Sequence, residues 1–346
     1  MLVRVPEADT ESDPTSAPAY CIRGTVRQEK GDLDGAIEDF NKAIELDPEF
    51  VEAFNNRGNA RRGKGDLPGA IADYNKAIEL DLRRALVYYN RGVARKSMGD
   101  LVGAIEDYNK AIELDPKDAM AYNSRGGARK SMGDLAGAIE DHNKAIEINP
   151  KYAVAYNNRG VARHDKGDLE GAIEDYNKAI ELDPKSTEAY YNRARSWKAK
   201  GDLEGAIEDY SKAIEIDPRN AGAYHNRGTI YCDSLRDYDR AISDFTGAIK
   251  LDPNCASAYY CRGNARKGKG DLDGAIEDYS KAIELNPKYA EAYTNRGFLR
   301  GSQGNFRAAI AEYEKALEVA PANWRYRKMV EKNLAQTRKE LAGNGK

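Results

Sequence analysis

The chain has 346 residues, of which 57 are acidic and 54 are basic, and a formal net charge of −3 at pH 7. This near balance argues against a nucleic-acid-binding protein, which needs a basic excess or a basic stripe. No apolar run approaches the roughly 18–20 residues that span a bilayer, so we expect no membrane association.

Residues 1–17 come before any regular pattern. They hold several acidic residues and two prolines, and they lack the apolar stretch of a signal peptide. We predict a disordered acidic tail here. The four cysteines show no Cys-x-x-Cys spacing, and we expect them to be reduced thiols in a cytoplasmic protein.

From residue 18 to residue 321, one sequence motif recurs every 34 residues, as from Gly126 to Gly160. A clear copy is AYNNRGVARHDKGDLEGAIEDYNKAIELDP at 155–184, and we count nine repeats. Repetition at this period indicates a stack of like units. Function is then expected on a surface that many repeats share, and a single catalytic pocket is not expected.

Each repeat has the pattern of a helical hairpin. In the repeat 153–186, we predict a first helix at about 154–166, which Gly167 stops by taking the left-handed conformation. Asp168 can cap the second helix, predicted at about 169–182, and Pro184 closes the repeat. The second helix has one apolar face, formed by Ala172, Ile173, Tyr176, Ala179 and Ile180.

The small residues carry a family resemblance. Gly160 is followed by Ala172, Tyr176, Ala179 and Pro184 at spacings that resemble the tetratricopeptide repeat. The resemblance covers all nine repeats. It implies an all-α fold, an α-solenoid in which antiparallel helix pairs stack into a right-handed superhelix. The first helix of each pair would line a concave groove.

Two columns depart from the family pattern. Arginine stands next to the small residue in every repeat, as Arg159 does, and again three residues after it in seven repeats, as Arg163 does. A carboxylate column runs along the second helices, with Asp175 as the example. We expect an Arg–carboxylate ladder inside and between repeats. The alternative is a track of arginines that binds anions.

The resemblance also implies that four positions of each first helix face the groove. Two residues before the glycine stands mostly asparagine, whose amide can hydrogen-bond the backbone of an extended peptide. Four residues after it stands mostly a basic residue, as in Arg62, Lys96 and Lys130. An acidic or C-terminal peptide segment would suit this surface. The alternative is that these are ordinary solvated residues.

The seventh repeat breaks the pattern. It has one extra residue in the turn at 232–238 and lacks the Gly-Asp stop. An irregular joint is either neutral or shapes a binding site, and aromatic and arginine anchors usually dominate interfaces. Together with the groove columns, this gives our predicted partner-binding residues: Asn56, Tyr89, Asn90, Asn158, Tyr191, Asn192, Arg195, His225, Asn226 and Tyr260.

After residue 321 the repeat is lost. Residues 323–341 mix Trp324, Met329, Val330, Leu334 and Leu341 with many charges. We predict that 322–346 forms a helix that caps the array, followed by a short flexible tail.

We find no support in the sequence for an enzyme, a metal site or a cofactor. The segments 58–64 and 263–269 resemble a phosphate-binding loop, but they lack its Ser/Thr and the preceding strand. His142 replaces the packing tyrosine, while His164 and His225 have no companion at metal-ligand spacing.

We therefore predict a non-enzymatic scaffold that binds a peptide or protein segment in the groove. Two alternatives stay open. One is a structural spacer or self-associating assembly unit, and the other is a recognition subunit for an enzyme on another chain. The sequence does not identify the partner or the oligomeric state.

Overall fold

The computed structural model describes residues 14–343, which form helices and turns and contain no strand. The chain divides into two compact units, 1–183 and 184–346. Of the predicted N-terminal tail, residues 1–13 lie outside the described residues. Ser16 caps the first helix, which begins at Ala17.

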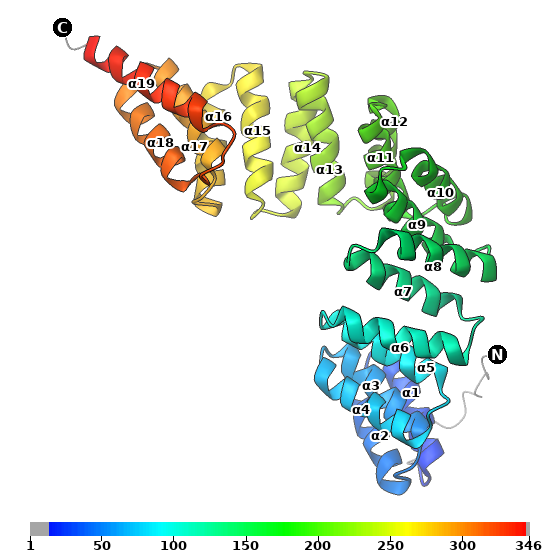
Figure 1. Ribbon diagram of the computed structural model, residues 1–346. Coiled ribbons are helices and arrows are strands. Elements are labelled where there is room, and N and C mark those ends of the chain that lie inside the picture. The colour runs from blue at the N-terminus through cyan, green and yellow to red at the C-terminus, as the bar shows by residue number, and fades with distance from the viewer. Residues whose placement is uncertain (1–13, 344–346) are drawn as a thin grey trace. The chain divides into compact units, whose positions relative to one another are not determined.

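The first unit contains five helical hairpins, and within it neighbouring hairpins pack against each other (Figure 1). The helices are α1 (Ala17–Glu29), α2 (Leu33–Leu46), α3 (Val51–Gly63), α4 (Leu67–Leu80), α5 (Ala85–Ser97), α6 (Leu101–Leu114), α7 (Ala119–Ser131), α8 (Leu135–Ile148), α9 (Ala153–Lys166) and α10 (Leu169–Leu182).

The second unit contains four hairpins and a final helix, which packs on α18. Its elements are α11 (Thr187–Lys200), α12 (Leu203–Ile216), α13 (Ala221–Thr229), the π-turn η1 (Ile230–Ser234), α14 (Tyr238–Leu251), α15 (Ala256–Lys269), α16 (Leu272–Leu285), α17 (Ala290–Ser302), α18 (Phe306–Val319) and α19 (Arg327–Gly343). The predicted all-α repeat solenoid is confirmed. The right-handed superhelix stays a prediction from the family resemblance.

In seven of the nine hairpins, the turn forms as the Gly-Asp pair predicts. Gly167 has a φ of 91° and ends α9 in the left-handed conformation. Asp168 caps α10, and its Oδ1 accepts a hydrogen bond of 3.0 Å from the backbone N–H of Gly171. The turn therefore satisfies one of the N–H groups that a helix start leaves without a partner.

The glycine inside eight of the nine first helices makes room for a ring, and Ala194 takes its place in the sixth repeat. A Cβ on Gly160 would lie 2.6 Å from Cε1 of Tyr176, which projects from the second helix of the same repeat and is almost fully buried. The tyrosine ring covers the glycine of its own hairpin, so the glycine is needed for the ring as well as for close backbone approach. The equivalent Tyr108 also clusters with Ala128 of the next repeat, so the ring contributes to packing between repeats too.

The predicted Arg–carboxylate ladder is present. Arg159 donates through Nε to Asp175 Oδ2 at 3.0 Å, and Arg163 donates through Nη1 to the same oxygen at 2.9 Å. Arg159 also reaches the preceding repeat, where Asn143 Oδ1 accepts from its Nη1 at 2.7 Å. Its guanidinium lies 5.5 Å from the ring centroid of Tyr156. These arginines hold carboxylates, amides and rings of the array itself, which argues against the anion-binding track.

The seventh repeat absorbs its extra residue inside the first helix. The helix passes from α13 into the π-turn at Ile230–Ser234, which accommodates one residue more per turn than an α-helix. We had placed the extra residue in the turn itself. Arg236 then takes the place of the stop glycine with a φ of 56°, and Asp237 caps α14 as in the other repeats.

Helix α19 covers the apolar end of the last repeat. Val330 and Leu334 are buried in a cluster with Tyr293, Tyr313 and Ala316. The helix begins at Arg327, later than the predicted 322. The reason lies in the segment Pro321–Tyr326, where Trp324 Nε1 donates to Glu291 Oε1 at 2.8 Å and Arg327 Nη2 donates to the carbonyl of Leu317 at 3.1 Å.

Candidate functional site

The first helices are linked to one another by side chains that we predicted to face a ligand. In the first unit, Asn90 Nδ2 donates to Asn55 Oδ1 of the preceding repeat at 2.9 Å. Asn158 Nδ2 donates in the same way to Asn123 Oδ1 at 3.1 Å. Asparagines two residues before a glycine therefore donate to the column of side chains three residues before the glycine of the preceding repeat.

Asn56 and Tyr89 belong to the same columns. Asn56 donates to Thr25 Oγ1 on α1 at 3.4 Å. The Tyr89 hydroxyl accepts from Ser124 Oγ at 3.4 Å, and its ring packs on Tyr108 with centroids 5.9 Å apart. In Asn90 and Asn158, one N–H of each side-chain amide therefore binds the preceding repeat.

In the second unit, three predicted residues line one pocket of about 310 Å³. They are Tyr191 on α11 and His225 with Asn226 on α13, and Asp252 and Cys255 close the pocket from the next connection. Asn226 Nδ2 donates to the Tyr191 hydroxyl at 3.0 Å. The structure thus brings together side chains that are 35 residues apart in the sequence.

Aromatic contacts hold this pocket in place. The Tyr191 ring meets Tyr210 edge-on at 5.7 Å between centroids, and the His225 ring meets Phe245 at 5.6 Å. Burial, with a smaller effect of Lys198, lowers the pKa of His225 below its usual value. The imidazole is therefore neutral at pH 7 and offers a polar, uncharged wall.

Arg195 and Asn192 lie on α11 beside this pocket but do not line it. Both are half-buried, and the backbone carbonyl of Asn192 accepts from Ser196 Oγ at 3.4 Å. Neither of them lines the pocket of Tyr191 and His225.

Tyr260 on α15 lies between two further pockets. One of about 400 Å³ is lined by the π-turn residue Cys232, by Arg236 and by Lys267. The other, of about 200 Å³, is lined by Glu291, Trp324 and Tyr326 among others. The Tyr260 hydroxyl accepts from Asn295 Nδ2 at 3.2 Å, and burial raises the pKa of this phenol.

Sequence reasoning missed the role of Trp324, Tyr326 and Glu291 in this region. We had assigned both aromatic residues to the capping helix, because they follow the last repeat and stand among its charges. The available signal was the position of two aromatic residues directly after Pro321, where a helix has not yet begun.

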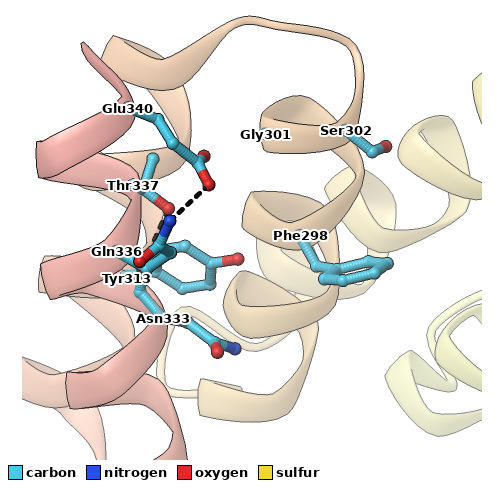
Figure 2. Close-up of a pocket in the computed structure, with 8 residues that line it drawn as sticks. All are labelled: Phe298, Gly301, Ser302, Tyr313, Asn333, Gln336, Thr337 and Glu340. Carbon is cyan, nitrogen blue, oxygen red and sulfur yellow. Dashed lines mark hydrogen bonds between the residues drawn. The ribbon is translucent and has the colours of Figure 1, made fainter. Parts of the chain in front are cut away.

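A last pocket, of about 230 Å³, lies between α17 and α19 (Figure 2). Phe298 borders it from α17 and is 54% exposed. On α19, Gln336 Nε2 donates to Glu340 Oε1 at 2.8 Å, so the polar groups of this wall bind each other. None of our predicted site residues lines it.

A basic column follows the first helices of the first unit. Arg62 Nε is buried without a hydrogen-bond partner among the described residues. The Lys96 ammonium lies 3.1 Å from where a Cβ on Gly127 would be. Burial, together with the charge of Lys130, lowers the pKa of Lys96. An anionic group would be favoured beside Lys96 and Lys130, whose positive charges repel each other.

The described residues contain no group of three or more His, Cys, Asp or Glu side chains that could hold a metal ion. Burial raises the pKa of Cys232 and of Cys261 to about 12, so both thiols stay protonated at pH 7 and are poor nucleophiles. The glycines of the two segments that resemble phosphate-binding loops lie largely within α3 and α15. No helix in the described part is long and apolar enough to cross a membrane.

Comparison with known protein families agrees with the hairpin geometry. A family described as "TPR repeat" matches residues 24–64, 58–99, 126–167, 162–196, 198–233 and 264–304. Families described as "Tetratricopeptide repeat" match residues 85–118, 221–255 and 290–323. A search of curated proteins gave no match.

Several solved structures are similar. A tetratricopeptide repeat protein from Parabacteroides merdae matches with a TM-score of 0.58 and 22% identity, over 72% of this chain and 98% of that chain. The MamA protein matches with a TM-score of 0.45 and 31% identity, over 50% of this chain and 94% of that one. YrrB, described as a TPR protein with an unusual peptide-binding site, matches with a TM-score of 0.45 and 27% identity, over 54% and 97%. The repeated family matches cover more than half of the sequence, and the chain belongs to the tetratricopeptide repeat family.

Proposed function

We propose that this protein is a non-enzymatic scaffold of the cytoplasm that binds a segment of another protein on the first-helix faces of its repeats. The array would span 18–321, with 322–346 as its cap. One observation carries the proposal. Tyr191, His225 and Asn226 line one pocket of the second unit, and Tyr260 lines two more. These are residues that the repeat pattern alone selects as groove positions.

We further propose that the bound segment carries acidic side chains where it meets the first unit. Arg62 and Lys96 support this, because the first has a buried donor without a partner and the second is partly desolvated beside Lys130. A carboxylate there would offset the repulsion between the two lysines.

The test is affinity capture with a pair of matched variants. Tyr191→Ala/Tyr260→Ala removes two rings from the pockets. Tyr190→Ala/Tyr259→Ala removes the adjacent tyrosines, which instead lie under Arg193 and Arg262 of the ladder, with the guanidinium 5.5 Å from the ring centroid in both cases. Circular dichroism checks that all variants keep their helicity.

We expect a protein that the wild type and the Tyr190/Tyr259 variant retain and that the Tyr191/Tyr260 variant loses. Equal capture by all three proteins would contradict binding on these faces. Capture of this same chain alone would favour the self-associating unit, and an enzyme lost with the pocket rings would favour the recognition subunit.

A further inference from the structure

The pocket of about 200 Å³ at the end of the second unit has a chemistry that the repeat pattern does not supply. It forms where α15 and α17 meet the segment that leads into α19. Its wall combines aromatic rings from two of these parts with one carboxylate, namely Tyr260, Trp324, Tyr326 and Glu291. Among the described residues that line it, Glu291 is the only charged one.

The rings and the carboxylate are held by one another. Trp324 Nε1 donates to Glu291 Oε1 at 2.8 Å, which fixes the indole against α17. The Trp324 ring meets Tyr326 nearly edge-on, with centroids 5.7 Å apart and an interplanar angle of 81°. Tyr260 packs on Tyr289 at 4.9 Å between centroids. The pocket is therefore ordered before any ligand arrives.

The charge on Glu291 is not balanced within the array. Its carboxylate accepts a hydrogen bond from the neutral Trp324 indole, and within the described residues no ion pair neutralises it. A carboxylate beside aromatic faces attracts a cation twice, through its own charge and through the negative faces of the rings. The Tyr326 ring already contacts one cation, because the Arg325 guanidinium lies 4.4 Å from its ring centroid. Arg325 itself does not line the pocket.

We propose that this aromatic pocket binds a basic side chain, of lysine or arginine, from the partner protein. The small volume admits a single side chain and excludes a helix. The inference rests on the proposed function, since the side chain would belong to the bound segment. It also adds a cation-binding position to a surface for which the sequence suggested only acidic ligands.

The test uses the full chain with one reporter in the pocket. The protein has two tryptophans, so Trp197→Phe leaves Trp324 as the only one. Its fluorescence is followed while Nα-acetyl-lysine amide is added, and then its neutral isostere Nα-acetyl-norleucine amide. We expect a saturable change with the lysine probe and none with the norleucine probe.

Two variants of the same background sharpen the test. Glu291→Gln removes the charge but keeps an oxygen that can accept the Trp324 N–H, so the indole should stay in place. We expect it to raise the apparent Kd for the lysine probe at least tenfold. Glu188→Gln changes the equivalent position of the sixth repeat, which does not line the pocket, and should leave the Kd unchanged.

An equal response to both probes would overturn the inference, as would unchanged lysine binding by the Glu291→Gln variant. Because the probe is a single amino acid, the result does not depend on partner capture. Probe binding without any captured protein would support the pocket and contradict the proposed function. Capture of a partner without any probe response would support the proposed function and contradict the cation-binding pocket.

Discussion

The arginine beside each small residue holds the array together through contacts of three kinds. Arg159 joins the two helices of its repeat through Asp175, reaches Asn143 in the repeat before and lies over the ring of Tyr156. Its side chain is 16% exposed and that of Asp175 is 3% exposed, so both charges are largely withdrawn from water. A buried pair of this kind is costly to break from one side only.

We predict strong coupling between these two residues. Asp175→Leu should cost about 3–5 kcal/mol of unfolding free energy, because it leaves two arginines without their carboxylate. Arg159→Leu should cost less, since Arg163 still holds Asp175. The double variant should fall short of the sum by about 1–3 kcal/mol. Urea denaturation of the four proteins measures the difference, and additive losses would contradict the ladder.

His142 is the second residue whose environment makes a prediction. It takes the ring position that phenylalanine or tyrosine fills in the other repeats, and both of its ring nitrogens are buried without a hydrogen-bond partner. Burial, followed by the charges of Arg159, Lys130 and Lys96, lowers its pKa to about 4. The folded protein therefore prefers the neutral imidazole.

The sign of the pH dependence follows. An unfolded histidine titrates at about 6.5, so the stability linked to neutral His142 is complete above that pH. This stability is lost as the pH falls from about 6.5 toward 4. The loss in unfolding free energy reaches about 2 kcal/mol at pH 5. Between pH 7 and pH 5, we expect the unfolding free energy of the wild type to fall by about 2 kcal/mol more than that of the His142→Phe variant. An equal loss in the two proteins, measured by urea denaturation, would contradict this assignment.

At the scale of the elements, the π-turn is the main departure from regularity. The extra residue at Ile230–Ser234 keeps the helices on either side in the repeat register, but the chain must still reverse after Leu235. Arg236 makes that reversal with a φ of 56°, in a region that costs a residue with a Cβ about 1–2 kcal/mol. All other hairpins among the described residues use glycine there.

Arg236→Gly should therefore stabilise the second unit by about 0.5–1 kcal/mol, because glycine adopts this conformation without steric cost but loses more entropy on folding. The thermal unfolding midpoint would rise. As a control, Gly270→Arg places a side chain at the same turn position of the eighth repeat, where φ is 93°, and should lower the midpoint. A lower midpoint for Arg236→Gly would show that the arginine contributes contacts that exceed the strain.

The sequence predicts hairpins, turns and the ladder because each depends on contacts repeated in every repeat. Gly167 and Asp168 define their turn locally, and Arg159 and Asp175 recur at fixed spacing. It could not place the aromatic pocket, because Trp324 and Tyr326 occur once and depend on Glu291 from another helix. Nor could it show that Asn90 bonds to Asn55, since an exposed amide and a bonded one look alike in a sequence.

At the scale of the whole molecule, the two helices of each hairpin pack on each other, and within each unit a hairpin also packs on the hairpins next to it. In the second unit, two of the pockets lie where the regular pattern fails, one beside the π-turn and one at the segment before α19. The regular repeats form the helical array, and the π-turn and the segment before α19 add side chains that have no counterpart in the other repeats.

Site-specific photocrosslinking tests most directly whether a partner contacts the first-helix face of the second unit. Tyr191 or Tyr260 is replaced by p-benzoylphenylalanine, and Tyr190 or Tyr259 is replaced in matched proteins. We predict that the same partner crosslinks at 191 and 260 but not at 190 and 259. Crosslinking at all four positions alike, or at none in a lysate that contains a captured partner, would contradict the claim.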